Sequence, residues 1–134
     1  MNKKTAAYWI CTTLIAFVFL PGGIFYVMRV PPVVAGVAQL GFPAHFVTFL
    51  GAWKVLGAIA VLAPGFALLK EWAYAGMFFD LTGAAVASFA TGNAWWHVLA
   101  PLAIAVVLVA SWALRPPSRR VSIPLSRQAA RAGA

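Results

Sequence analysis

Two side chains of opposite charge, Lys54 and Asp80, each stand near the middle of a long apolar stretch of the sequence. Each stretch has about 20 residues, the length of a helix that crosses the hydrocarbon core of a bilayer. A charged group at that depth costs about 2.5–3.5 kcal/mol, so it normally faces protein or water rather than lipid. The two residues are therefore the strongest candidates in the sequence for chemistry inside a membrane.

The direction of the two stretches places these charges at the same depth. Lys54 lies nine residues before the end of its stretch at Ala63, and Asp80 lies eight residues after the start of its own at Trp72. With a rise of about 1.5 Å per residue in antiparallel helices, the two depths agree within a few ångströms. We expect an ion pair. It is either a structural device that fixes the register of two helices, or a proton, ion or ligand site.

Small residues surround both charges. At about 100° per residue, the helix face that carries each charge is rich in small side chains, which let a neighbouring helix approach closely, whereas bulky aromatic side chains suit lipid. We therefore predict that both charged faces pack against other helices. The face of Asp80 consists of Ala73, Gly76, Met77, Gly83, Ala84, Ala87 and Ser88, the opposite face holds Phe78, Thr82, Ala85 and Phe89, and the face of Lys54 consists of Val47, Leu50, Gly51, Gly57, Ala58 and Val61.

The other polar residues near the apolar stretches give weaker signals. His45 and His97 lie near stretch ends and suit interfacial hydrogen bonding or donation to a quinone carbonyl, and a metal or haem site would need further ligands. We interpret Glu71 as a solvated interfacial acid beside Lys70, and Arg29 as a headgroup anchor or a closure of the outer mouth. No metal site is expected, and the sequence contains no nucleophile elbow, phosphate loop or metalloprotease motif.

The composition is that of an integral membrane protein. Of the 134 residues, 63% are hydrophobic and 9% are charged, against about 25% charged residues in soluble domains. Four apolar stretches predict membrane-spanning helices over residues 6–28, 44–63, 72–91 and 94–114. We therefore expect an all-α fold, an antiparallel four-helix transmembrane bundle, within residues 1–115.

Proline, glycine and polar residues mark the irregular segments. Pro21 lies inside the first span, so we expect a kink or break there. In the connection that follows, prolines and glycines exclude a continuous span and leave room for a short interfacial helix over residues 33–40. Residues 67–71 are predicted as a turn. Residues 116–134 are basic without apolar periodicity, which predicts a disordered tail that is dispensable for folding from Ser118 onward.

Basic residues are distributed unevenly between the two sides of the predicted bundle. The formal net charge is +8, and eight of the ten Lys and Arg residues fall on the side of the two termini. Because cytoplasmic loops are enriched in Lys and Arg, both termini are expected in the cytoplasm. Because the basic residues flank apolar spans, the positive net charge does not indicate nucleic-acid binding, and nucleic acid is not an expected partner. The eight residues are Lys3, Lys4, Lys70, Arg115, Arg119, Arg120, Arg127 and Arg131.

Several short runs have a recognisable order and spacing. The most specific is LKEWAYAG from Leu69 to Gly76. It is preceded by LGFP at residues 40–43 and LGAWK at residues 50–54 with Gly57, and followed by Phe79-Asp80 and Gly83-Ala84. Over about residues 8–114 the chain resembles the DoxX-like family, small bacterial membrane proteins of four helices. Related members often carry histidine directly after the serine of the third helix, where this chain has Phe89.

The resemblance implies a multi-pass protein of the bacterial inner membrane and leaves three functions open. Some relatives are subunits of a thiosulfate:quinone oxidoreductase or partners in other membrane oxidoreductases, which implies a non-catalytic subunit or assembly partner of a quinone-linked redox system. The alternatives are a small-molecule or proton-coupled transporter that uses Lys54 and Asp80, and an enzyme acting on a lipophilic substrate. The bilayer and a redox-enzyme subunit are the expected partners, quinone is the candidate cofactor, and the sequence leaves oligomer formation open.

Overall fold

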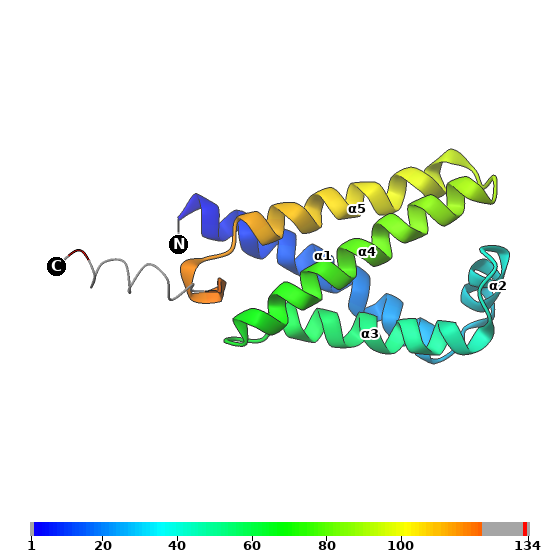
Figure 1. Ribbon diagram of the computed structural model, residues 1–134, viewed down its shortest axis with the longest axis horizontal. Helices are drawn as coiled ribbons and strands as arrows, with labels where there is room; N and C mark the ends of the chain where they lie inside the picture. Colours follow the sequence, from blue (N-terminus) through cyan, green and yellow to red (C-terminus); the bar gives the residue numbers. More distant parts are fainter. Residues whose placement is uncertain (1, 122–132, 134) are drawn as a thin grey trace.

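The computed structural model is a bundle of four long helices with a short helix at one end, and it describes residues 2–121 and 133 (Figure 1). The elements are α1 (Lys3–Val27), α2 (Pro31–Gln39), α3 (Ala44–Leu62), α4 (Ala67–Ala90), α5 (Trp95–Ala113) and a 3-10 helix, η1 (Pro117–Arg119). The helices α1, α3, α4 and α5 are each long and apolar enough to cross a membrane. The prediction of an all-α, antiparallel four-helix bundle is confirmed.

The four long helices pack chiefly as two pairs. α1 packs mainly against α3, and α4 mainly against α5, while α1 with α5 and α3 with α4 make smaller contacts. Figure 1 shows the start of α1 and the segment after α5 at the same end of the bundle, where the turn between α3 and α4 also lies. The hydrophobic core between the helices consists of Ile15, Phe19, Ala58, Val61, Tyr74, Met77, Leu81, Ala105 and Leu108.

Two glycines allow α1 and α3 to cross closely. A Cβ atom added at Gly51 would lie 2.5 Å from the Cβ atom of Tyr26 and 2.8 Å from the carbonyl oxygen of Gly23. Helix pairs with glycine at the crossing gain close van der Waals packing, which is a main source of helix association in lipid. The predicted packing of the Lys54 face is therefore confirmed at this crossing. The buried residues of α3 are Val47, Gly51, Ala58 and Val61.

Hydroxyl groups join α1, α4 and α5 in the half of the bundle near the termini. Thr12 Oγ1 and Ser111 Oγ lie 2.7 Å apart, and the Tyr74 hydroxyl lies 2.8 Å from the same Ser111 oxygen. All three residues are buried. Because lipid offers these groups no hydrogen-bond partner, the network holds the three helices in one relative position.

The two predictions that rest on proline had different outcomes. α2 (Pro31–Gln39) is the short helix predicted over residues 33–40, and its two prolines stand in the first turn, where a missing N–H costs nothing. α1 runs without interruption through Pro21, so a break is excluded, whereas the alternative of a kink stays a prediction. Neighbouring helices and local adjustments satisfy the backbone groups that proline frees within a membrane, which is why such a helix stays continuous.

The turn between α3 and α4 is shorter than predicted. We expected a turn over residues 67–71 and a span from Trp72, whereas α4 begins at Ala67. The chain reverses just before it, with left-handed φ angles of 73° at Gly65 and 51° at Phe66. The charged pair at residues 70 and 71 had indicated a loop, but both side chains find partners on neighbouring helices and remain in α4.

Two basic side chains cover the C-terminal end of α3. Lys70 is fully buried, and its ammonium group donates to the carbonyl oxygens of Ala60, at 2.8 Å, and Ala63. The guanidinium group of Arg119 donates to the carbonyl oxygens of Val61 and Ala63, both at 3.2 Å. The last carbonyls of a helix lack partners within it and carry partial negative charge, so both cations stabilise this end.

The beginning of the predicted disordered tail is therefore ordered, which corrects the prediction for this segment. Pro117–Arg119 form η1, and Arg120 Nε donates to the carbonyl oxygen of Arg115 at 2.7 Å. Hydrogen bonds from arginines to helix ends hold the segment, and neither composition nor apolar periodicity reveals such bonds. The rest of the predicted tail, apart from Gly133, lies outside the described residues.

Loss of Arg119 is expected to destabilise the bundle. Truncation after Pro117 removes the guanidinium group from the end of α3, which should cost about 1–2 kcal/mol because its hydrogen bonds are charge-assisted. Truncation after Val121 keeps Arg119 and is expected to leave stability unchanged. Thermal unfolding of both truncated proteins in the same detergent measures the difference. Equal stability would instead show that the chain is dispensable from Ser118 onward, as the sequence predicted.

Candidate functional site

Lys54 and Asp80 form an ion pair where α3 faces α4. Lys54 Nζ lies 2.7 Å from Asp80 Oδ2, and the two side chains are 16% and 14% exposed. The contact expected from their matching depths is present. Each residue is well inside its helix, so the pair lies far from both ends of the bundle.

Aromatic rings of α1 complete the surroundings of the ammonium group. Lys54 Nζ lies 4.8 Å from the centre of the Phe19 ring and 5.1 Å from that of Tyr26. The negative face of an aromatic ring attracts a cation at such distances. Three helices therefore contribute to the site. Sequence reasoning missed both rings, because a Phe or Tyr inside an apolar stretch carries no signal that distinguishes it from lipid-facing neighbours.

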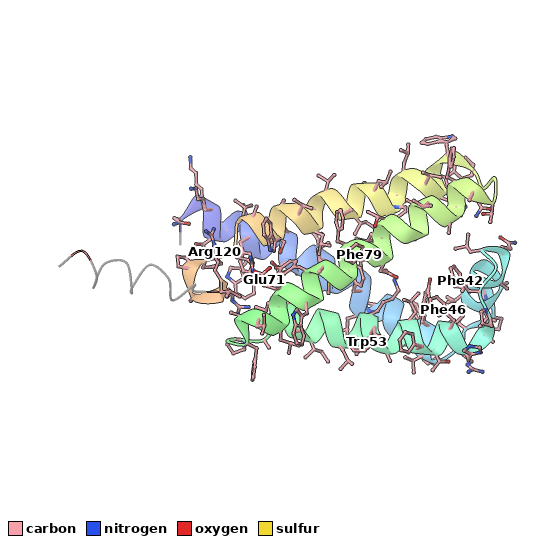
Figure 2. The ribbon with its side chains drawn as sticks, in the orientation of Figure 1. Phe42, Phe46, Trp53, Glu71, Phe79 and Arg120 are labelled. Carbon is pink, nitrogen blue, oxygen red and sulfur yellow. The ribbon has the colours of Figure 1, made fainter. Side chains whose placement is uncertain are left out.

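The ion pair lies in a groove of about 710 Å³ between α3 and α4, named here the α3–α4 groove. The groove extends from the turn between these helices, at Ala63 and Phe66, to Lys54 and Asp80 near its other end. Within the described part of the chain, these two are its only charged lining residues, and the others are apolar or aromatic. Its aromatic rim is more than half exposed, so the groove opens onto the outer surface of the bundle. Figure 2 labels two of the rim residues, Trp53 and Phe79. The rim residues are Trp53, Phe66, Trp72 and Phe79.

The small-residue face of α4 packs only in part: Met77 and Ser88 of this face are buried, whereas its glycines are open, which corrects the sequence prediction at those positions. Nothing lies within 4 Å of a Cβ atom placed at Gly76 or Gly83, and Gly76 lines the groove. The packed face is centred near Leu81, about 100° around the helix from Asp80, and Ala85, assigned to the lipid side, is buried. Asp80 therefore stands at the edge of the packed face, where it reaches Lys54 and borders the groove. The buried residues of α4 are Lys70, Tyr74, Met77, Leu81, Ala85 and Ser88.

An apolar layer separates the ion pair from the hydroxyl network near the termini. Along α4, the buried Met77 lies between Tyr74 of the network and Asp80. Along α1, the buried Ile15 follows Thr12 of the network. Between residues 2 and 121, no hydrogen bond found in the structure connects the two polar groups. In this conformation the ion pair is open to the groove rather than to the end of the bundle that carries the termini.

Glu71 belongs to a separate polar cluster where α4 meets α5. Its carboxylate lies 2.6 Å from the guanidinium group of Arg115 and accepts a hydrogen bond from Trp112 Nε1 at 3.0 Å. Glu71 is thus partly solvated, with its side chain 31% exposed, but it is also paired, which the interpretation as a solvated acid beside Lys70 did not include. Successive residues of a helix point about 100° apart, so Lys70 reaches α3 while Glu71 reaches α5.

The remaining candidates lie away from the groove. His45 and His97 are exposed in the first turns of α3 and α5. Arg29 has a left-handed φ angle of 51°, and its Nε donates to Thr48 Oγ1 at 2.7 Å, which ties the connection after α1 to α3. Within the described residues, no group of three His, Cys, Asp or Glu side chains is placed to hold a metal ion. The structure thus brings together only Lys54 and Asp80 among the candidates.

A comparison with protein families identifies the chain. The family model described as the DoxX-like family matches residues 10–111, well over half of the sequence. The chain belongs to the DoxX-like family. No curated protein and no solved structure matches it. Family membership and four long apolar helices make this DoxX-like chain a multi-pass membrane protein. The ion pair and every lining residue of the α3–α4 groove lie within the matched region, whereas Arg115 and Arg119 lie beyond it.

Proposed function

We propose that this DoxX-like protein is a non-catalytic subunit of a membrane redox system that binds a quinone in the α3–α4 groove. The observation that supports this proposal most strongly is the Lys54–Asp80 pair near one end of an otherwise apolar groove that opens towards lipid. A lipophilic molecule with a small polar head matches this combination. Its tail would lie along the apolar walls, and its head would meet the ion pair.

The ion pair offers complementary hydrogen bonds to such a head. A lysine ammonium group has three donors and a carboxylate has two acceptor oxygens, whereas the pair itself uses one donor and Asp80 Oδ2. Lys54 can therefore donate to a quinone carbonyl oxygen, and Asp80 can accept from a hydroxyl group of the reduced form. A neutral head suits the site, because an anionic head would meet Asp80 and a cationic head would meet Lys54.

The groove walls support a binding role rather than a catalytic one. Apart from the ion pair, the lining side chains are apolar or aromatic. This chain would hold and orient the quinone, and a partner subunit of the redox system would transfer the electrons. The apolar layer at Ile15 and Met77 favours this role over proton-coupled transport, which needs a polar path from the pair to an aqueous side.

The proposed setting is a bacterial inner membrane with both termini in the cytoplasm. The excess of lysine and arginine at the end of the bundle that carries the termini supports this orientation. In that setting the α3–α4 groove lies in the cytoplasmic half of the bilayer, because it extends from the α3–α4 turn towards the middle of the spans.

Filling the groove is expected to abolish quinone binding without unfolding the protein. Gly76→Phe places a ring into open space in the groove. Gly83→Phe places the same ring into open space on the same helix, outside the groove. Titration of the full-length protein in nanodiscs with a short-chain ubiquinone should give at least tenfold weaker binding for Gly76→Phe and unchanged binding for Gly83→Phe.

The same titration separates the competing functions. Equal affinity of the two variants, or no binding by the unmodified protein, would contradict a quinone site in this groove. Chemical turnover of the quinone by the purified chain alone would favour an enzyme acting on a lipophilic substrate. Thermal unfolding of both variants controls for a loss of structure, which neither open glycine position should cause.

A further inference from the structure

A second groove, of about 290 Å³, lies between α4 and α5 and is named here the α4–α5 groove. Its ends differ in chemistry. Glu71 and Trp112 line the end near the termini, and the remainder is apolar or aromatic, including Ala75, Phe78 and Val109. An amphiphile has the same division between a polar head and an apolar tail.

The polar end of this groove presents charges of both signs. The Glu71 side chain is 31% exposed although it already pairs with Arg115, so its carboxylate has room for a further donor. Arg120 is exposed at the same end of the bundle, held by hydrogen bonds to the carbonyl oxygens of Arg115, at 2.7 Å, and Ala113, at 3.2 Å. Figure 2 shows Glu71 and Arg120 at the same end of the bundle. A partly exposed carboxylate and an exposed guanidinium group at one end of the bundle match a headgroup that contains both a cation and a phosphate.

Trp112 fits this position for two reasons. Its indole ring lines the groove, and its Nε1 donates to Glu71 at 3.0 Å. Tryptophan is enriched at the boundary between hydrocarbon and headgroups, because its ring is apolar and its N–H needs a polar partner. Trp112 therefore marks the depth at which a lipid headgroup would meet the protein.

We propose that the α4–α5 groove binds a phospholipid whose headgroup carries a primary ammonium group, as phosphatidylethanolamine does. The ammonium group donates to Glu71, the phosphate is attracted by Arg120, and one acyl chain follows the apolar part of the groove along Ala75 and Phe78. The lipid belongs to the leaflet at the side of the termini. This site is distinct from the proposed quinone site: Gly76 lines only the α3–α4 groove, Ala75 lines only the α4–α5 groove, and the two grooves share Phe79 alone.

The chemistry of Glu71 distinguishes this lipid from two common alternatives. A trimethylated ammonium group, as in phosphatidylcholine, has no N–H to donate to a carboxylate. An anionic headgroup without an ammonium group, as in phosphatidylglycerol, would meet the negative charge of Glu71 without an attractive partner for it. Selectivity among these three headgroups is therefore the property that the site confers.

Native mass spectrometry of the full-length protein with an equimolar mixture of these three phospholipids tests the proposal. We expect the phosphatidylethanolamine adduct to exceed each of the others at least fivefold. Glu71→Gln should remove this preference. Ala75→Phe should lower the phosphatidylethanolamine adduct at least fivefold, because the ring fills the groove, whereas Ala52→Phe, at an exposed alanine of α3 outside both grooves, should not.

The three variants and the three lipids together decide whether the α4–α5 groove selects this headgroup. Glu71→Gln removes the negative charge that pairs with the buried Arg115. If this variant does not fold, Ala75→Phe still tests the site, because it leaves the ion pair intact. Equal adducts of the three lipids, or equal adducts of the Ala75→Phe and Ala52→Phe proteins, would overturn the proposal. A dominant phosphatidylglycerol adduct would also overturn it, since the basic residues alone would then select the lipid.

Discussion

Replacing Lys54 by Met or Asp80 by Leu is expected to lower the free energy of unfolding by about 3–5 kcal/mol, because either change leaves a charge without its partner in apolar surroundings. The pair is close, with Nζ and Oδ2 2.7 Å apart, and both side chains are largely shielded. The double variant removes both charges together. It should therefore recover most of the loss, since well-packed apolar residues often replace a buried ion pair at little cost.

A double-mutant cycle measures this coupling. Reversible unfolding of the unmodified protein, the two single variants and the double variant in the same bicelles gives the interaction free energy as the departure from additivity. Losses that simply add would show that the two charges do not depend on each other. Lys54→Arg, which keeps the charge, is the matched control and should lose less stability than Lys54→Met.

The double variant also separates the two interpretations of the pair. If the pair only fixes the register of α3 and α4, the folded double variant should bind quinone as the unmodified protein does. If the pair holds the headgroup, the double variant should fold and bind at least tenfold more weakly. The proposed function requires the second result.

The crossing of α1 and α3 is the other place where one substitution should have a large effect. Leucine at Gly51 would place its Cβ atom 2.5 Å from the Cβ atom of Tyr26 and 2.8 Å from the carbonyl oxygen of Gly23. The two backbones would have to separate, at a cost of about 3 kcal/mol or more, because overpacking that displaces backbone lies at the upper end of measured penalties. Since the Tyr26 ring borders Lys54, quinone affinity should fall as well.

Leucine at Gly22 is the matched control for this substitution. Gly22 is beside the crossing on α1, and nothing lies within 4 Å of a Cβ atom at that position. Leucine there should leave stability unchanged or raise it slightly, by up to about 1 kcal/mol, because it favours a helix more than glycine does. Thermal unfolding and quinone titration of both variants provide the comparison. Equal stability of the two proteins would contradict a close crossing at Gly51.

The spans were predictable because a bilayer imposes a length on every helix that crosses it. The ion pair was predicted from residue counts to Ala63 and Trp72, and it forms although α4 begins five residues before Trp72. The third span was predicted to begin too late, because Lys70 reads as a loop residue until its acceptors on α3 are known.

The grooves could not be predicted, and lipid is the physical reason. In a soluble protein an apolar face marks the core. Lipid tails are as apolar as leucine, so a small or apolar face of a membrane helix can pack equally well against another helix or against lipid. Gly51 and Gly76 both lie on small faces beside a charge, yet Gly51 packs against α1 and Gly76 borders an open groove. The difference depends on how far the neighbouring helices diverge. The residue pattern of a single helix gives no information about that divergence.

The contacts of α5 and η1 have a consequence for the synthesis of the chain. Ser111 binds Thr12 across 99 positions of the sequence, and Arg119 binds the carbonyl oxygen of Val61 across 58. Transmembrane helices form one by one before they associate, so α1 and α3 enter the bilayer long before these partners exist. Thr12 of α1 and the C-terminal end of α3 stay incompletely bonded until residues 111–119 have left the ribosome. A nascent chain stalled earlier would expose Thr12 and the carbonyl oxygens of α3, and would be a better substrate for membrane proteases than the finished protein.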